Sequence, residues 1–92
     1  MAVQTVAGTG PVNVDLSTKG RRVGAWHFSN ITAAAVINLR NGTVGGAIYA
    51  QIQLAAPASA SQAYSMPPGL LFPAGVFVEI VSGTVTGSVD IY

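Results

Sequence analysis

Apolar and polar residues alternate with a period of two along most of this chain, and no stretch carries a sustained apolar repeat of 3.6 residues. Successive side chains of a β-strand point to opposite faces, so this period is typical of strands with one buried face. The apolar residues that share a phase in the clearest runs are Val12, Val14 and Leu16; Ala35, Ile37 and Leu39; Ile48, Ala50, Ile52 and Leu54; and Val85, Val89 and Ile91. The alternation therefore predicts an all-β protein.

Two further segments are predicted to be strands. In the segment Val23 to Asn30, Trp26 and Phe28 are expected to point inward and His27 outward. Residues 76–81 are apolar on both phases except at Glu79. That pattern indicates a central strand, or a strand whose outer face is covered by a partner.

Glycine-containing turns separate these strands. Asn41-Gly42 is a strong turn signal because both residues tolerate a positive φ, and it is predicted to open the connection to a strand that begins near Ala47. Ser82-Gly83 is predicted to form a hairpin between the last two strands. The stretch MPPGLLFPAG, residues 66–75, is predicted to be a crossover between strands or sheets, because proline cannot pair within a central ladder.

These signals together predict a small antiparallel β-sandwich, jelly-roll-like, with about seven or eight short strands. A chain of 92 residues is long enough for one domain, here residues 1–92. Within it, residues 1–10 can form an extended N-terminal arm that reaches a neighbouring subunit. The first residues show no basic leader, and the long uncharged stretch 41–78 is interrupted by Gly and Pro, so neither a signal peptide nor a membrane span is predicted.

The charge content is unusually low. Charged residues make up 8% of the chain, against roughly 25% in ordinary soluble domains, and the formal net charge is +1. Little electrostatic repulsion therefore keeps copies of the protein apart. Because the chain has no cysteine, disulfides cannot supply stability to this small domain. We expect the protein to self-associate.

Residues for catalysis or for metal and cofactor binding are scarce. His27 is the only histidine, and Asp15, Glu79 and Asp90 are the only carboxylates. No strand–Gly-rich turn–helix pattern is present for a nucleotide phosphate. The sequence therefore predicts a non-enzymatic protein without a catalytic, cofactor or metal site.

Two groups of residues are candidates for a partner interface. Arg21 and Arg22 follow a turn, where they are either solvated residues at the entrance of a strand or a contact for an acidic partner protein. Nucleic acid usually needs a wider basic surface. Leu71 and Phe72 adjoin each other in a chain that prolines keep extended, so they face opposite ways. Whichever points outward is predicted to contact a neighbouring subunit or the capsid. In the alternative, the loop closes an open end of the sandwich and Leu70, Leu71 and Phe72 are all internal. Tyr49 is the fifth candidate.

The C-terminal two-thirds of the chain resembles small virion proteins of tailed bacteriophages. The features that carry the resemblance are Ile37 to Gly42, Gly45-Gly46, Ala47 to Leu54, Met66 to Gly75, and Val76 to Tyr92. They correspond to a strand ending in Asn-Gly, a glycine pair, an alternating strand, a Pro/Gly segment ending in an aromatic residue, and two closing strands. These motifs are structural rather than chemical.

The resemblance implies a β-sandwich that is made in the host cytoplasm and placed on the virion, most commonly as a capsid decoration (cement) protein that reinforces the shell. Its partners would be the major capsid protein or another virion protein, with no role for nucleic acid or a membrane. It also implies a homo-oligomer, a trimer in particular. The alternatives are a fibre or tail accessory component and a small carbohydrate-binding module that uses Trp26, Tyr49 and Tyr64.

Overall fold

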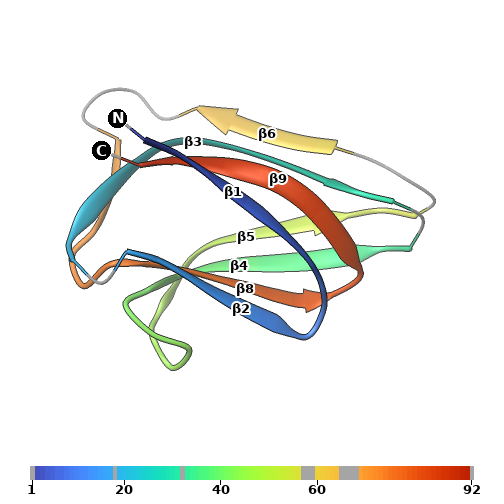
Figure 1. Cartoon of the computed structure of the whole chain (residues 1–92), viewed down its shortest axis with the longest axis horizontal. Coiled ribbons are helices and arrows are strands. Elements are labelled where there is room, and N and C mark those ends of the chain that lie inside the picture. The colour runs from blue at the N-terminus through green and yellow to red at the C-terminus, as the bar shows by residue number, and fades with distance from the viewer. Residues whose placement is uncertain (1, 18, 32, 57–59, 65–68, 92) are drawn as a thin grey trace.

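The computed structural model of the chain describes residues 2–17, 19–31, 33–56, 60–64 and 69–91. Regular structure in these residues consists entirely of β-strands (Figure 1). The strands are β1 (Ala2–Thr9), β2 (Val12–Ser17), β3 (Arg21–Asn30), β4 (Ala35–Asn41), β5 (Ile48–Leu54), β6 (Ala60–Tyr64), β7 (Leu70–Phe72), β8 (Val76–Ser82) and β9 (Thr84–Ile91). The predicted all-β class is confirmed.

The strands form two antiparallel sheets that pack face to face. One sheet has the order β1-β9-β3-β6, with β7 also paired to β3, and the other has the order β2-β8-β4-β5. Val23 of β3 pairs with Ile91 of β9 on one side and with Leu70 of β7 on the other. Because β6 and β7 both pair along the side of β3 away from β9, they act as two halves of one edge strand.

Most consecutive strands lie in opposite sheets, which is the connectivity of a jelly roll. This order confirms the predicted jelly-roll-like sandwich and corrects one detail of it. β8 and β9 do not form a hairpin, because β8 pairs with β2 and β4 whereas β9 pairs with β1 and β3. Ser82-Gly83 is instead a corner between the sheets. The turn signal located the reversal of the chain correctly, but it carried no information about which sheet the next strand joins.

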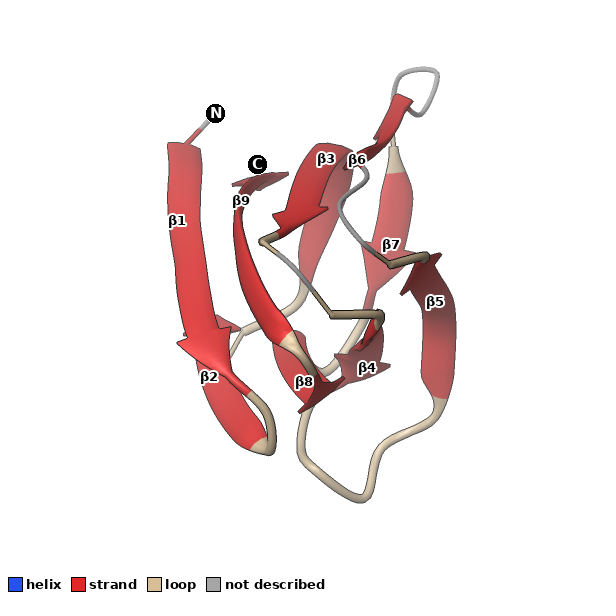
Figure 2. Ribbon diagram, turned by 90° about the vertical axis from the view of Figure 1, so that its right-hand side faces the viewer, coloured by secondary structure: helices blue, strands red, loops and turns tan. Residues whose placement is uncertain are grey.

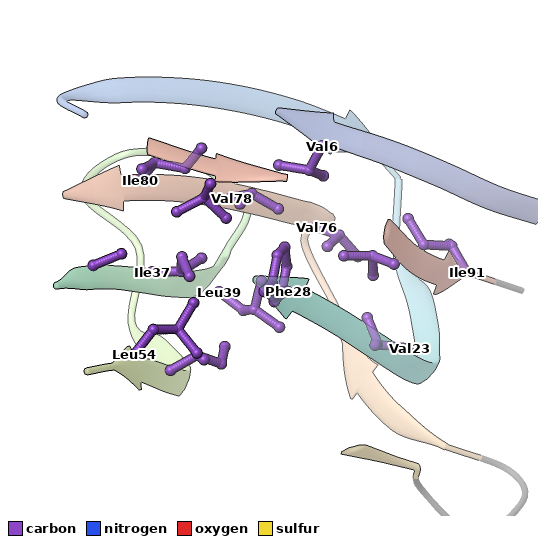
Figure 3. Close-up of a cluster of buried hydrophobic side chains, with 14 of the residues drawn as sticks. Val6, Val23, Phe28, Ile37, Leu39, Leu54, Val76, Val78, Ile80 and Ile91 are labelled. Atoms are coloured by element: carbon purple, nitrogen blue, oxygen red, sulfur yellow. The ribbon is translucent and has the colours of Figure 1, made fainter. Parts of the chain in front are cut away.

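The inward faces of both sheets meet in one apolar layer (Figure 3). Phe28 and Phe72 are the largest of its fully buried side chains. The other members are Val6, Val23, Ala35, Ile37, Leu39, Ile52, Leu54, Val76, Val78, Ile80, Val85, Val89 and Ile91. These include most of the residues whose phase predicted a buried position, and Trp26 packs against the layer from its rim. β8 is central in its sheet, as its two apolar phases indicated.

A β-bulge changes the expected phase at the start of β5. Leu39 pairs with Ala50, but Arg40 pairs with Ile48, so Tyr49 is an extra residue without a directly opposed partner on β4. Ile48 is consequently on the outer face and 45% exposed, although simple alternation predicted it inside. A bulge inserts one extra residue into a strand, so residues on its N-terminal side, here Ile48, face the side opposite to the one that simple alternation predicts.

The stretch at residues 66–75 is only partly the irregular crossover that its prolines predicted. Leu70–Phe72 forms the short strand β7, and the chain then passes to β8 in the opposite sheet through Gly75, whose φ is 121°. The crossover between sheets is thus confirmed for the described part, with a strand at its beginning. Met66, Pro67 and Pro68 lie outside the described residues.

The N-terminal segment lies within the domain. Ala2–Thr9 pairs over its whole length with β9 of the same chain, from Ala2 opposite Ile91 to Thr9 opposite Thr84. Val6 is fully buried in the apolar layer. The residues proposed as an arm that reaches a neighbouring subunit therefore form an edge strand of their own sheet.

The corner at Gly83 provides a test of the jelly-roll connection. Gly83 has a φ of 81°, and a Cβ added there would lie 2.6 Å from the backbone oxygen of Ala34. We expect Gly83→Ala to lower the free energy of unfolding by at least about 1 kcal/mol, because the left-handed conformation alone costs that much. Gly45→Ala is the control, since a Cβ at Gly45 meets nothing within 4 Å. Equal urea denaturation midpoints for the two variants would contradict the constrained position of Gly83 at the turn between the two sheets.

Candidate functional site

All five predicted interface residues lie at one corner of the sandwich. The pairing of β3 with β7 puts Arg22 opposite Leu71 and Arg21 opposite Phe72. Tyr49, at the bulge of β5 in the other sheet, packs against the same phenylalanine, with ring centroids 5.1 Å apart and the ring planes tilted by 43°. Segments separated by more than twenty residues in sequence are thus brought together. We call the group Arg21, Arg22, Tyr49 and Leu71, with Phe72 beneath it, the β3–β7 corner.

The structure decides which residue of the apolar pair points outward. Leu71 is 43% exposed, whereas Phe72 is 0% exposed and belongs to the core. The alternative in which the loop buries all three side chains from Leu70 to Phe72 is therefore wrong, and so is the assignment of Phe72 to an interface. A fully buried side chain cannot touch a partner of the folded protein. Phe72 instead supports the corner from below, in contact with Tyr49.

The corner carries two positive charges that have no carboxylate partner among the described residues. The ion pair found in this part of the chain joins Arg40 and Glu79. Arg21 donates from Nη1 to the backbone oxygen of Gly20 at 2.9 Å and is exposed, and Arg22 is half-buried beside Leu71. Arg22 shares the outer face of the sheet with Leu71, whereas Arg21 has the phase of Phe72, on the side from which Tyr49 packs. A guanidinium group beside an exposed leucine suits a partner with a carboxylate next to an apolar patch.

A row of polar side chains on the outer face of the four-stranded sheet was not anticipated. Three donors converge on Oε1 of Glu79: Asn38 Nδ2 at 2.9 Å, Arg40 Nε at 3.0 Å and Arg40 Nη2 at 3.0 Å. Gln51 Nε2 donates to Asn38 Oδ1 at 2.9 Å, and Gln53 Nε2 donates to Gln51 Oε1 at 3.1 Å. This row crosses β8, β4 and β5 and orients the amides toward the carboxylate.

The hydrogen bond from Asn38 is the main cause that lowers the pKa of Glu79, with Arg40 adding to it and desolvation opposing it. The sequence contained a partial signal for this row. Asn38, Gln51 and Glu79 all lie on the outward phase of predicted strands, but their pairing depends on the order β8-β4-β5, which alternation does not reveal.

The residues considered for catalysis do not come together as a nucleophile and base. His27 is exposed on the outer face of the five-stranded sheet, as predicted, and lies opposite Ser88 of β9. No hydrogen bond among the described residues joins it to Ser88 or to Asp90. Nucleophilic catalysis depends on such a contact between the nucleophile and its base.

The aromatic side chains that the structure describes do not form an open platform for a sugar ring. Trp26 packs against the core, and its Nε1 is buried without a hydrogen-bond partner in the described structure. Tyr49 is 40% exposed, but its ring is tilted onto Phe72. The side chain of Tyr64 lies outside the described ones. Stacking on a sugar needs a free aromatic face, so this arrangement gives the carbohydrate-binding alternative no support.

One shallow hollow lies at the far end of the four-stranded sheet. It has a volume of about 380 Å3 and is formed by residues at the start of β4 and the end of β5. Its lining consists of Ala34, Ala35, Val36, Gln53, Leu54 and Ala55. Gln53 supplies the one side chain there with hydrogen-bonding groups, so the hollow offers little to orient a ligand.

The chain matches no family model, no curated protein and no solved structure. The resemblance to virion proteins of tailed phages therefore rests on the sequence features themselves. In the described part of the chain, no helix is long and apolar enough to span a membrane. No group of three or more His, Asp or Glu side chains that could hold a metal ion occurs there either.

The Glu79 contacts predict how stability depends on pH. Because the folded state lowers the pKa of Glu79 below its ordinary value of 4.5, the unfolded state binds the proton more tightly. The stabilisation from this carboxylate is therefore complete above pH 4.5 and is lost as the pH falls below it.

We expect Glu79→Gln to flatten the decline in unfolding free energy below pH 4.5, as measured by urea denaturation at a series of pH values. Asp15→Asn, at an exposed carboxylate on the neighbouring strand β2, is the control and should retain the wild-type decline. If the unfolding free energy of Glu79→Gln declines with falling pH as steeply as that of the wild type, the three donors to this carboxylate do not cause the loss of stability at acid pH.

Proposed function

We propose that this protein is a non-enzymatic structural component of a tailed-bacteriophage virion that decorates the outer capsid surface and reinforces the shell. The observation that carries the proposal is the β3–β7 corner, where the exposed Leu71 lies opposite Arg22, next to Arg21 and to the buried Phe72, and neither arginine has a carboxylate partner among the described residues. A surface of this kind serves attachment to another protein, since it supplies apolar area and charge in one place.

In the proposed mechanism the domain bridges adjacent capsid subunits. Leu71 docks against an apolar patch of the major capsid protein, while Arg21 and Arg22 pair with carboxylates around it. β7 is held in the sheet by its pairing with β3, and Phe72 anchors it from below, so little order has to be gained on binding. Binding at many equivalent positions of the shell converts a modest affinity per contact into firm attachment.

The low charge of the chain fits this role, because a protein held on a particle does not depend on charge for its own solubility. Within this proposal, the location on the capsid surface rests on the resemblance alone. Electron microscopy of virions produced by the genome that encodes the chain tests it. Density for the sandwich on the capsid surface supports decoration, density within a fibre or the tail supports the accessory role, and particles without the chain contradict the proposal.

Single substitutions at the corner separate docking from folding. We expect Leu71→Ser to abolish attachment and to change the free energy of unfolding by less than about 0.5 kcal/mol, because the side chain is exposed. Phe72→Ser should cost about 3–5 kcal/mol, as large-to-small changes of buried phenylalanine do. Attachment is measured by adding purified variants to particles that lack the protein, followed by sedimentation.

Val81→Ser is the matched control, since Val81 is 42% exposed on β8, in the opposite sheet from β7. It should attach as the wild type does. Two results would show that the β3–β7 corner is not the docking surface. One is attachment of Leu71→Ser at the wild-type level, and the other is an equal loss of attachment in Leu71→Ser and Val81→Ser.

A further inference from the structure

We propose that β1 is a pairing edge through which two copies of this chain join their five-stranded sheets into one continuous sheet. In the described residues β1 pairs with β9 alone, and Figure 2 shows it at the margin of the sheet with no strand on its other side. The outer side of such a strand presents backbone N–H and C=O groups that lack a partner strand. These groups are a template for pairing with another chain.

The other sheet edges carry features that discourage such pairing. β2 has the exposed carboxylate of Asp15 and a register shift between Asp15 and Ser17. β5 has the bulge at Tyr49. The edge opposite β1 is divided into β6, with five residues, and β7, with three. Charges, bulges and short segments are the usual devices by which proteins protect exposed strand edges.

None of these devices occurs in β1. Its eight residues pair with β9 in unbroken register, from Ala2 opposite Ile91 to Thr9 opposite Thr84. The segment AVQTVAGT contains no charged residue and no proline. Its outward side chains are exposed, and Val3, at 65%, is the most exposed large apolar side chain of the described residues. A straight, uncharged edge of this length is well suited to strand addition.

A second copy is the occupant that this edge fits best. Two identical strands can pair antiparallel about a twofold axis, which makes the contact self-complementary. With Thr5 on the axis, Val3 of one copy lies opposite Ala7 of the other on the outer face, so the exposed valine gains an apolar neighbour. No like charges are brought together across the pair, because the strand carries none.

The contact also limits itself to two chains. Pairing of β1 with β1 consumes the unprotected edge of both copies, and the edges left over are the protected ones. The product is therefore a dimer. A twofold contact replaces the trimer that the phage resemblance implied, and it does not depend on the proposed location on a capsid.

Placing a charge on the axis tests the contact. We expect the wild type to have the mass of two chains by light scattering and Thr5→Lys to have the mass of one, because two ammonium groups would face each other across the pair. Thr5 is exposed, so its own domain should keep the wild-type melting temperature. Thr86→Lys is the matched control: it is exposed on the same face but on β9, one strand in from the edge, and should remain dimeric.

A cross-link tests the pairing independently of any effect on folding. Because the chain has no cysteine, Thr5→Cys would be its one thiol. Opposed residues of antiparallel strands have Cα atoms about 4.5–5.5 Å apart, within the range that a disulfide spans. Oxidation should convert Thr5→Cys into a disulfide-linked dimer. Thr86→Cys is the control and should form no disulfide-linked dimer.

A monomeric or trimeric wild type overturns the proposal, as does a Thr5→Lys variant that stays dimeric or a Thr5→Cys variant that fails to couple. These measurements use isolated protein without particles, so their failure is distinct from a failure of capsid attachment. Leu71→Ser, which is expected to lose attachment, should remain a dimer because the β3–β7 corner and β1 lie on opposite edges of the sheet.

Discussion

The apolar layer between the two sheets is the feature on which the whole domain depends. The chain has no cysteine to cross-link it, so the sandwich holds together through side chains buried from both sheets. Each fully buried Val, Leu, Ile or Phe contributes roughly 1.5–3 kcal/mol, whereas the net stability of a domain is typically only about 5–15 kcal/mol. Loss of one large member such as Phe28 or Phe72 therefore removes a substantial part of the stability.

The same layer positions the candidate interaction surface. Phe72 belongs to the core, and its neighbour Leu71 must point the other way because β7 pairs regularly with β3. Core packing thus fixes the orientation of the exposed leucine and of Arg22 opposite it. Tyr49 reaches the same phenylalanine from the other sheet because of the bulge in β5. The proposed docking surface is rigid for the same reason that the domain is stable.

The two proposed contacts use surfaces with different chemistry. The β3–β7 corner combines guanidinium groups with apolar side chains, which suits a different protein with carboxylates. The β1 edge offers uncharged backbone groups in regular register, which suits an identical strand. Since these surfaces lie on opposite edges of the five-stranded sheet, a dimer joined at β1 would present two corners facing away from each other. Such a dimer could bridge two sites on a larger assembly, and bivalent attachment raises the apparent affinity.

Period-two alternation in the sequence determined the fold class, the phase of most strands and the inward positions of residues such as Phe28 and Ile37, because burial of one strand face is a local pattern. The extended chain around Leu71 and Phe72 predicted that one of them faces outward, but burial of both stayed open as the alternative. Only the tertiary structure decided which one, that Ser82-Gly83 turns between sheets, that Ile48 is shifted outward by a bulge, and that Glu79 meets Asn38 and Arg40. These outcomes depend on which strands become neighbours, and neighbours are chosen by the packing of the whole layer rather than by the order of residues along one strand.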